Sequence, residues 1–130
     1  MVKKNEIEIC FIANAPINSK KISIYQTLSQ AKALSSYCKV NICLPNRIDF
    51  SITSKNIYEE VKKRLGTKKE ITFKIIPINY FDLFNKKWLN IHIKFAISNF
   101  SYAFCAIRYA LKIKSKILYT RDFYTLLILS

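Results

Sequence analysis

The chain has 130 residues, of which 51% are hydrophobic, and its 22 basic and 8 acidic residues give a net charge of +14. This length and apolar content suit one domain with a real core and exclude a disordered chain. One glycine and three prolines are too few for an all-β fold rich in tight turns, a linker or a low-complexity segment, and they favour long helices alternating with short strands.

The first predicted strand lies within Glu6–Ala13, where alternating residues give way to a continuous apolar run. Such a pattern is typical of a strand in a sheet that is buried on both faces. After a polar loop, Ser23 is the predicted N-cap of a helix, with Gln26 at capping-box spacing. Apolar residues then recur every three or four positions between 24 and 37, which defines the first helix.

A second strand is predicted over Val40–Leu44, so the chain opens with a β-α-β unit. Strands joined by a crossover helix run parallel and the crossover is right-handed, which indicates a layered α/β sheet. A short helix over Ile57–Leu65 is predicted to end at Gly66. A third strand over Ile71–Ile76 is predicted to end at Pro77.

The longest helical signal covers residues 93–111 and contains one apolar stripe. We expect this stripe to face the core of the domain, with alanines beside it that let a neighbouring element approach closely and polar residues on the opposite side. Lys94 and Arg108 would each cost about 2.5–3.5 kcal/mol at the centre of a bilayer, which argues against a membrane span. The stripe consists of Ile93, Ile97, Phe100, Phe104, Ile107 and Leu111; the alanines are Ala96, Ala103 and Ala110; and the polar side carries Lys94, Ser98, Ser101, Arg108 and Lys112.

A fourth strand is predicted over Lys116–Tyr119, and the turn at Thr120–Asp122 leads into an apolar segment, Phe123–Leu129. This last segment resembles the first two turns of a helix and has no C-terminal cap. We therefore expect residues 1–130 to be one domain that is incomplete at its C-terminus.

The four cysteines, at positions 10, 38, 43 and 105, form no C-x-x-C pair, and only His92 could join them in a zinc site. We expect buried free thiols, no metal and no cofactor. Residues 1–8 carry charges of both signs and no apolar run, so nothing marks secretion, and a reducing cytoplasm is the expected location. His92 lacks an orienting partner for general-base work and is expected to be an ordinary interfacial histidine.

Basic residues are distributed unevenly, because the segment from Leu83 to Arg121 has eight of them and no acidic residue. Such an excess favours an anionic partner, which can be nucleic acid, phospholipid headgroups or a phosphorylated substrate. An AT-rich genome, whose codons favour Lys, Ile, Asn, Phe and Tyr, would give the same composition whatever the function. Trp88 and the basic edge of the long helix leave open a contact with anionic lipid.

Four segments, in this order, are similar to the N-terminal domain of family 4 glycosyltransferases: Phe11–Pro16, Ser19–Gln26, Val40–Arg47 and Ile117–Asp122. In that family a strand, a loop, a helix with an A-x-A-L motif and a second strand of the hxVxLxxP kind open the first Rossmann-like domain. The helix motif here is Ala31-Lys32-Ala33-Leu34, and Tyr37-Cys38-Lys39 stands in place of the family's Gly-His turn.

The resemblance implies a GT-B architecture, in which the N-terminal domain handles the acceptor and a C-terminal domain with two glutamates separated by seven residues holds the nucleotide-sugar. Residues 1–130 would form a partial, acceptor-side Rossmann-like domain of an enzyme that transfers a sugar to a lipid-linked or polysaccharide acceptor. The isolated chain would be inactive, and a separately encoded C-terminal domain is an open partner. The alternative is a stand-alone basic α/β module that binds the inner face of an anionic membrane or, less favoured, nucleic acid.

Two loops are predicted to hold the substrate-binding residues, because open α/β sheets bind ligands at the carboxyl ends of their strands. Lys20, Lys21 and Ser23 follow the first strand at a helix N-terminus, which favours anions, with a solvated loop as the alternative. Arg121 and Asp122 follow the fourth strand, where an arginine can hold a phosphate or carboxylate bidentately. For Asp122 the alternatives are a cap for the next helix or an ion pair with Arg121. The family's glycine-rich loop and nearby histidine are absent at these positions, and no catalytic residue is assigned.

Overall fold

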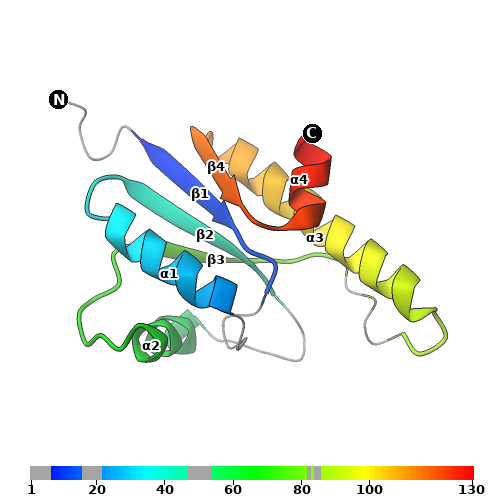
Figure 1. Cartoon of the computed structure of the whole chain (residues 1–130), viewed down its shortest axis with the longest axis horizontal. Helices are drawn as coiled ribbons and strands as arrows, with labels where there is room; N and C mark the ends of the chain where they lie inside the picture. Colours follow the sequence, from blue (N-terminus) through cyan, green and yellow to red (C-terminus); the bar gives the residue numbers. More distant parts are fainter. Residues whose placement is uncertain (1–6, 16–21, 47–53, 82, 84–85) are drawn as a thin grey trace.

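The computed structural model describes residues 7–15, 22–46, 54–81, 83 and 86–130. Within these residues, four strands and four helices alternate along the chain (Figure 1). Every predicted element is present and no boundary differs from its prediction by more than three residues, so the α/β fold class is confirmed. The elements are β1 (Glu8–Ile12), α1 (Ile22–Leu34), β2 (Lys39–Pro45), α2 (Ser54–Leu65), β3 (Lys74–Ile78), α3 (Ile91–Lys112), β4 (Ile117–Thr120) and α4 (Phe123–Leu129).

The strands form one parallel sheet in the order β3-β2-β1-β4. In the register of the sheet, Phe11 of β1 lies opposite Ile42 of β2 and Tyr119 of β4. The chain therefore moves outward from β1 through β2 to β3, and α3 then carries it back to place β4 on the other side of β1. This arrangement is Rossmann-like, and the reversal of strand order beside β1 is the point at which such sheets bind ligands.

Alternate residues of β1 face two separate apolar layers, as expected for a strand buried on both sides. Ile9 and Phe11 pack with the buried residues of α1 and α2. Cys10 and Ile12 pack with the buried residues of α3. Since Cys10, Phe11 and Ile12 are all at most 2% exposed, β1 is the centre of the core.

β3 begins three residues later than predicted, and it continues through Pro77 instead of ending there. Pro77 lies opposite Leu44 in an edge strand of the described sheet. A proline has no N–H to donate, so it is tolerated in a strand whose other side has no hydrogen-bonded neighbour. Pro77 therefore marks the border of the sheet and not the end of the strand.

α3 has the predicted length, but it is rotated about its axis relative to the prediction. Of the six residues in the apolar stripe, only Ile107 is buried, whereas Phe104 is 59% exposed. The side that faces the sheet instead carries Tyr102, small alanines, and the polar residues Ser98 and Asn99. The prediction that the stripe faces the core is therefore wrong.

Hydrogen bonds to the chain after β3 explain this rotation. The hydroxyl oxygen of Ser98 accepts from the N–H of Leu83 at 2.9 Å, and that of Ser101 accepts from the N–H of Phe81 at 2.8 Å. Ser98 satisfies the backbone donor of the buried Leu83, which would otherwise be left unpaired, and Ser101 adds a second bond in an exposed position. Small side chains such as Ala106, which is fully buried, let α3 lie close to the sheet.

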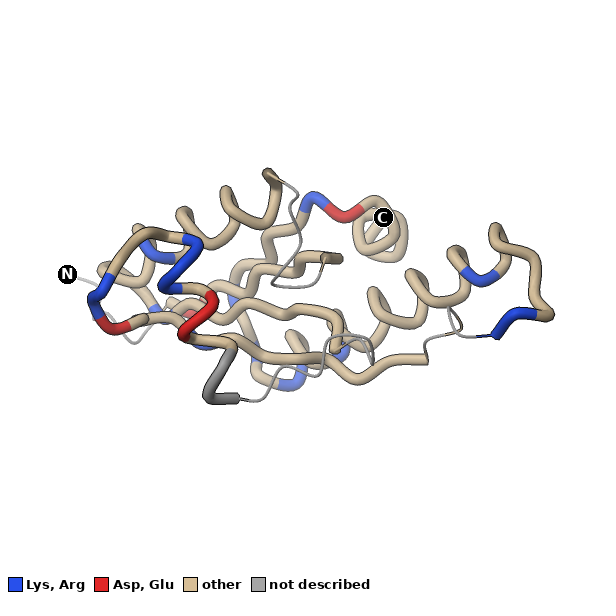
Figure 2. Tube along the Cα trace, turned by 90° about the horizontal axis from the view of Figure 1, so that it is seen from below, with Lys and Arg blue, Asp and Glu red and all other residues tan. Residues whose placement is uncertain are grey.

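The first turns of α3 project beyond the sheet, as two perpendicular views show (Figures 1 and 2). Neither α3 nor another helix in the described ranges is both long and apolar enough to cross a membrane.

Candidate functional site

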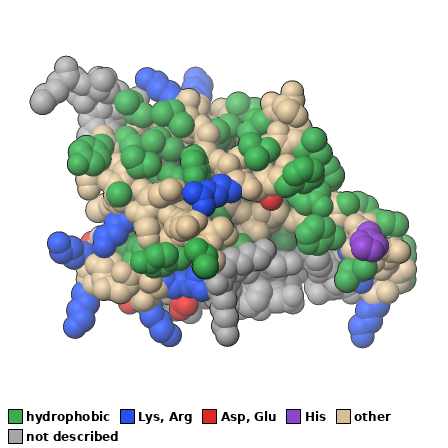
Figure 3. Space-filling model, viewed as in Figure 1, with side chains coloured by type: hydrophobic (Ala, Val, Ile, Leu, Met, Phe, Trp, Pro, Cys, Tyr) green, Lys and Arg blue, Asp and Glu red, His purple; other side chains and the backbone are tan. Residues whose placement is uncertain are grey.

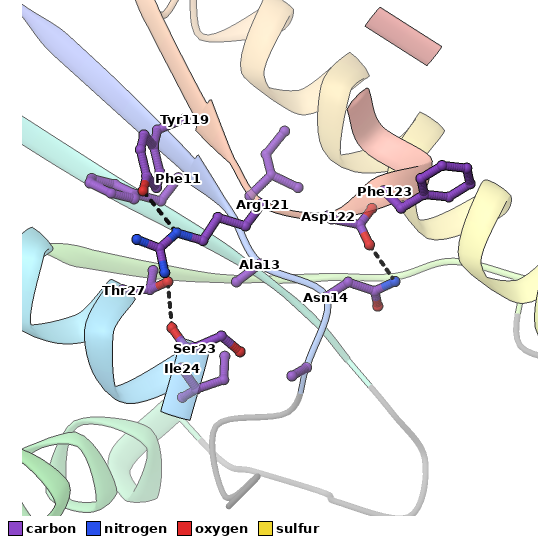
Figure 4. A pocket seen from close by; sticks show the side chains of 12 residues that line it. Phe11, Ala13, Asn14, Ser23, Ile24, Thr27, Tyr119, Arg121, Asp122 and Phe123 are labelled. Atoms are coloured by element: carbon purple, nitrogen blue, oxygen red, sulfur yellow. Dashed lines mark hydrogen bonds between the residues drawn. The ribbon is translucent and has the colours of Figure 1, made fainter. Parts of the chain in front are cut away.

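A pocket of about 200 Å³ lies at the carboxyl ends of β1 and β4, beside the first turns of α1 (Figure 4). Because β1 and β4 are adjacent where the strand order reverses, the pocket occupies the switch point of the sheet. Pockets that enclose drug-sized ligands measure about 300–1,000 Å³, so this one suits a single small group such as a phosphate or one sugar ring. The lining residues are Phe11, Ile12, Ala13, Asn14, Ala15, Ser23, Ile24, Thr27, Tyr119, Arg121, Asp122 and Phe123.

A buried tyrosine of α3 fixes the backbone at the start of the pocket. The hydroxyl of Tyr102 lies 2.6 Å from the carbonyl oxygen of Ala13 and 2.9 Å from that of Cys43, and its single proton is shared between these two acceptors. Burial raises the pKa of Tyr102 well above its ordinary value, so the hydroxyl keeps its proton and remains a donor. The ends of β1 and β2 are therefore tied to α3.

Arg121 extends from the end of β4 across the pocket toward α1 (Figure 4). Its Nε donates to the hydroxyl of Tyr119 at 3.0 Å, and its Nη1 donates to Oε1 of Gln26 at 2.5 Å. Both partners are neutral, and none of the salt bridges among the described residues involves Arg121. The described residues thus leave its positive charge uncompensated, and its remaining N–H groups face no acceptor among them and are free to bind a phosphate or carboxylate.

The carboxylate of Asp122 is engaged by neighbouring donors. Its Oδ2 accepts from the N–H of Thr125 at 2.8 Å and from the hydroxyl of Thr125 at 2.7 Å, which makes Asp122 the N-cap of α4. Its Oδ1 accepts from Nδ2 of Asn14 at 3.2 Å, and the same Asn14 amide donates to Oδ1 of Asn99 at 2.6 Å. The capping alternative is confirmed, whereas a ligand contact by Asp122 stays a prediction.

The structure brings Ser23 into the same pocket as the predicted residues after β4. α1 begins at Ile22, so Ser23 lies in the first turn of the helix and is not its N-cap. Gln26 does not complete a capping box, since its side-chain oxygen accepts from the arginine described above. Lys20 and Lys21 lie outside the described residues, and their roles stay predictions.

Sequence patterns alone do not assign three of the lining residues, Asn14, Thr27 and Tyr119, to a site. Asn14 did carry a signal, because a polar residue directly after a buried strand sits on the ligand side of a parallel sheet. Thr27 carried none: it is 8% exposed on the buried side of α1, where its hydroxyl donates to the carbonyl oxygen of Ser23 at 2.8 Å. Helical periodicity cannot separate a pocket wall from the core.

The cysteines and the histidine do not contribute to this site. Cys10 and Cys43 are buried with their Sγ atoms 3.5 Å apart, and the hydrogen bond between them, together with burial, raises the pKa of Cys43. A buried thiol with a raised pKa is unreactive. Cys38 is buried as well, as expected, whereas Cys105 is only partly buried. In the described part of the chain, no group of His, Cys, Asp and Glu could hold a metal ion. His92 is exposed at the start of α3 (purple in Figure 3) and does not line the pocket.

No family model, curated protein or solved structure matches the chain. The fold and the geometry of the pocket therefore carry the functional interpretation alone. Membership of the glycosyltransferase family stays a proposal.

Proposed function

We propose that this chain is the acceptor-side domain of a GT-B glycosyltransferase, whose complete form transfers a sugar from a nucleotide-sugar to an acceptor in the cytoplasm. The observation that carries the proposal is the position of Arg121 over a small pocket at the switch point of a parallel sheet. Open α/β sheets bind their ligands at this point. The pocket would hold a phosphate or carboxylate of the substrate, with neighbouring polar side chains for sugar hydroxyls.

The charges around the pocket favour an anion. Arg121 has neutral partners, and the first turn of α1, which borders the pocket, contains no acidic residue. The carboxylate of Asp122 accepts three hydrogen bonds from its neighbours, which offsets its negative charge. The N-terminal end of a helix carries a partial positive charge, which adds to the attraction for an anion.

The chain alone is expected to have no transferase activity. Transfer requires a donor and an acceptor held together in a reactive geometry, and the small pocket has room for one group. A second domain would have to hold the nucleotide-sugar opposite this pocket.

A stand-alone basic module that binds an anionic surface or polymer is the second candidate, favoured by the net charge of +14. Figure 2 shows lysines and arginines distributed over several elements and not gathered at the pocket. This candidate predicts binding that depends on many dispersed cations and is insensitive to Arg121.

The test combines the purified chain with a donor-binding α/β domain encoded beside its gene, one that carries two glutamates separated by seven residues. Transfer of radiolabelled sugar from nucleotide-sugars to lipid and polysaccharide acceptors should need both proteins. Arg121→Gln should lower kcat/KM for the acceptor at least about tenfold, because a charged hydrogen bond is lost. The control Lys68→Gln, in the loop after α2, should not change it.

Transfer by the chain alone, or transfer that Arg121→Gln leaves unchanged, would contradict the proposal. If no such domain restores transfer but Arg121→Gln still abolishes binding of inorganic phosphate, the anion pocket stands and the glycosyltransferase assignment fails.

A further inference from the structure

The rotation of α3 leaves an apolar surface on the outside of the domain. We call it the outer stripe: Ile93, Ile97, Phe100, Phe104 and Leu111, each between 38% and 67% exposed. These residues lie on one side of a single helix, since they are separated by three, four or seven positions. α4 packs beside the stripe, with the rings of Phe100 and Tyr124 4.8 Å apart in a T-shaped contact.

α4 extends this apolar surface. Leu126, Leu127 and Leu129 are each about half exposed, and Figure 3 shows hydrophobic side chains gathered on the surface over β4 and α4. A contiguous apolar surface of this kind on a domain marks a site of interaction with a partner or a membrane.

Cations border the stripe without acidic partners. Helical geometry places Lys94, Arg108 and Lys112 along one edge of it, and not on the opposite side of the helix as expected. None of the salt bridges among the described residues includes a residue of α3, β4 or α4. The only acidic residue from Leu83 to the end of the sequence is Asp122, whose carboxylate caps α4.

The charges around the outer stripe favour an anionic partner over a second copy of the chain. A second copy seated symmetrically on the stripe would bring like cations together, which is unfavourable. The chain also has few acids to offer, because three of the four described glutamates, Glu8, Glu59 and Glu70, already pair with lysines. An anionic surface with an apolar layer beneath it would match both parts: the apolar layer would contact the side chains of the stripe, and the anionic groups would contact the cations along its edge.

We propose that the outer stripe of α3 docks on an anionic lipid bilayer, with the helix lying in the plane of the interface. An interfacial helix buries an apolar side in the boundary of the acyl chains while cations at its edge meet the headgroups. Trp88, which is 80% exposed in the turn that leads into α3, is of the residue type that prefers this boundary. The docking does not depend on the transferase proposed above.

Flotation with lipid vesicles tests the proposal. The chain should float with vesicles of phosphatidylcholine mixed with phosphatidylglycerol, bind phosphatidylcholine alone weakly, and lose affinity as salt is added. Because Trp88 is the only tryptophan, a blue shift of its emission with the anionic vesicles reports contact at this end of α3. Equal binding to both kinds of vesicle, or none to either, would overturn the proposal.

Matched variants locate the surface. Phe104→Ser should weaken vesicle binding at least about tenfold, and Lys112→Gln about fivefold. The controls Tyr37→Ser and Lys68→Gln remove an exposed aromatic and an exposed lysine elsewhere and should bind as the parent chain does. Circular dichroism melts confirm that each variant is folded.

Two other outcomes would refute the lipid assignment. If Phe104→Ser dissociates a dimer in analytical ultracentrifugation and vesicle binding is unchanged, the stripe is a protein interface. If Lys112→Gln and Phe104→Ser instead weaken binding to single-stranded RNA but not to vesicles, the stripe binds nucleic acid.

Discussion

Arg121 and Asp122 are adjacent in the sequence but have different surroundings in the structure. Arg121 lies against the neutral side chains of Tyr119 and Gln26 and keeps an uncompensated charge among the described residues. Asp122 is held by three donors as the cap of α4. An exposed guanidinium fork that only neutral groups orient is suited to a bidentate anion, so Arg121 is the residue on which the proposed function depends most.

Tyr102 is the residue on which the position of the pocket backbone depends. Tyr102→Phe should lower the free energy of unfolding by about 1–3 kcal/mol, because the part-buried carbonyl oxygen of Ala13 loses its donor. Urea denaturation checks this value. An unchanged midpoint would show that the hydroxyl does not hold the end of β1.

The raised pKa of Tyr102 also gives the stability of the chain a pH dependence. The unfolded chain loses the phenol proton near pH 10.0, the ordinary value, while the folded chain keeps it to higher pH. This stability is therefore fully present below pH 10 and is lost as the pH rises above it. Stability of the parent chain should fall more steeply over that range than stability of Tyr102→Phe.

At the residue scale, the sequence identifies site residues that follow predicted strands. It does not identify site residues that lie within a helix and reach the pocket only through tertiary packing. Arg121 and Ser23 were predictable because each follows a strand whose apolar pattern is clear. Thr27 and Gln26 lie within a helix. Only the packing of α1 against the sheet places Thr27 in the pocket wall and Gln26 beside Arg121.

At the scale of elements, the type of each helix and strand is predictable, while its rotation and some ends are not. Local propensity and periodicity determine whether a segment is helix or strand. The end of β3 depends on which strand is at the edge, since only an edge strand tolerates Pro77. The rotation of α3 depends on partners such as the backbone N–H of Leu83, which a hydrophobic pattern does not contain.

A pair of substitutions in α3 distinguishes the observed rotation from the predicted one. Ala106→Leu should lower the free energy of unfolding by about 1–3 kcal/mol, because Ala106 is fully buried and the added atoms overpack the core. Phe104→Ser, on the outer stripe, should change it by no more than about 0.5 kcal/mol. The opposite ranking in chemical denaturation would show that the apolar stripe faces the sheet.

At the scale of the whole molecule, the sheet order carries the functional interpretation. The β-α-β pattern predicts parallel strands and the hand of each crossover, but it does not specify on which side of β1 the fourth strand lies. The structure places β4 beside β1. Because β4 pairs with β1, the loops that follow these two strands meet in one pocket although they are more than a hundred residues apart in the sequence. The hydrogen bond between Asn14 and Asp122 joins the two loops.

NMR titration of the isotope-labelled chain with inorganic pyrophosphate tests most directly whether this pocket is an anion site. Shift changes should concentrate at the backbone amides of Asn14, Ser23 and Asp122, and Arg121→Gln should weaken binding at least about tenfold, with glucose as an uncharged control. Changes spread over the dispersed lysines of α2 and α3, with an affinity that Arg121→Gln leaves unchanged, would contradict a ligand site at the switch point.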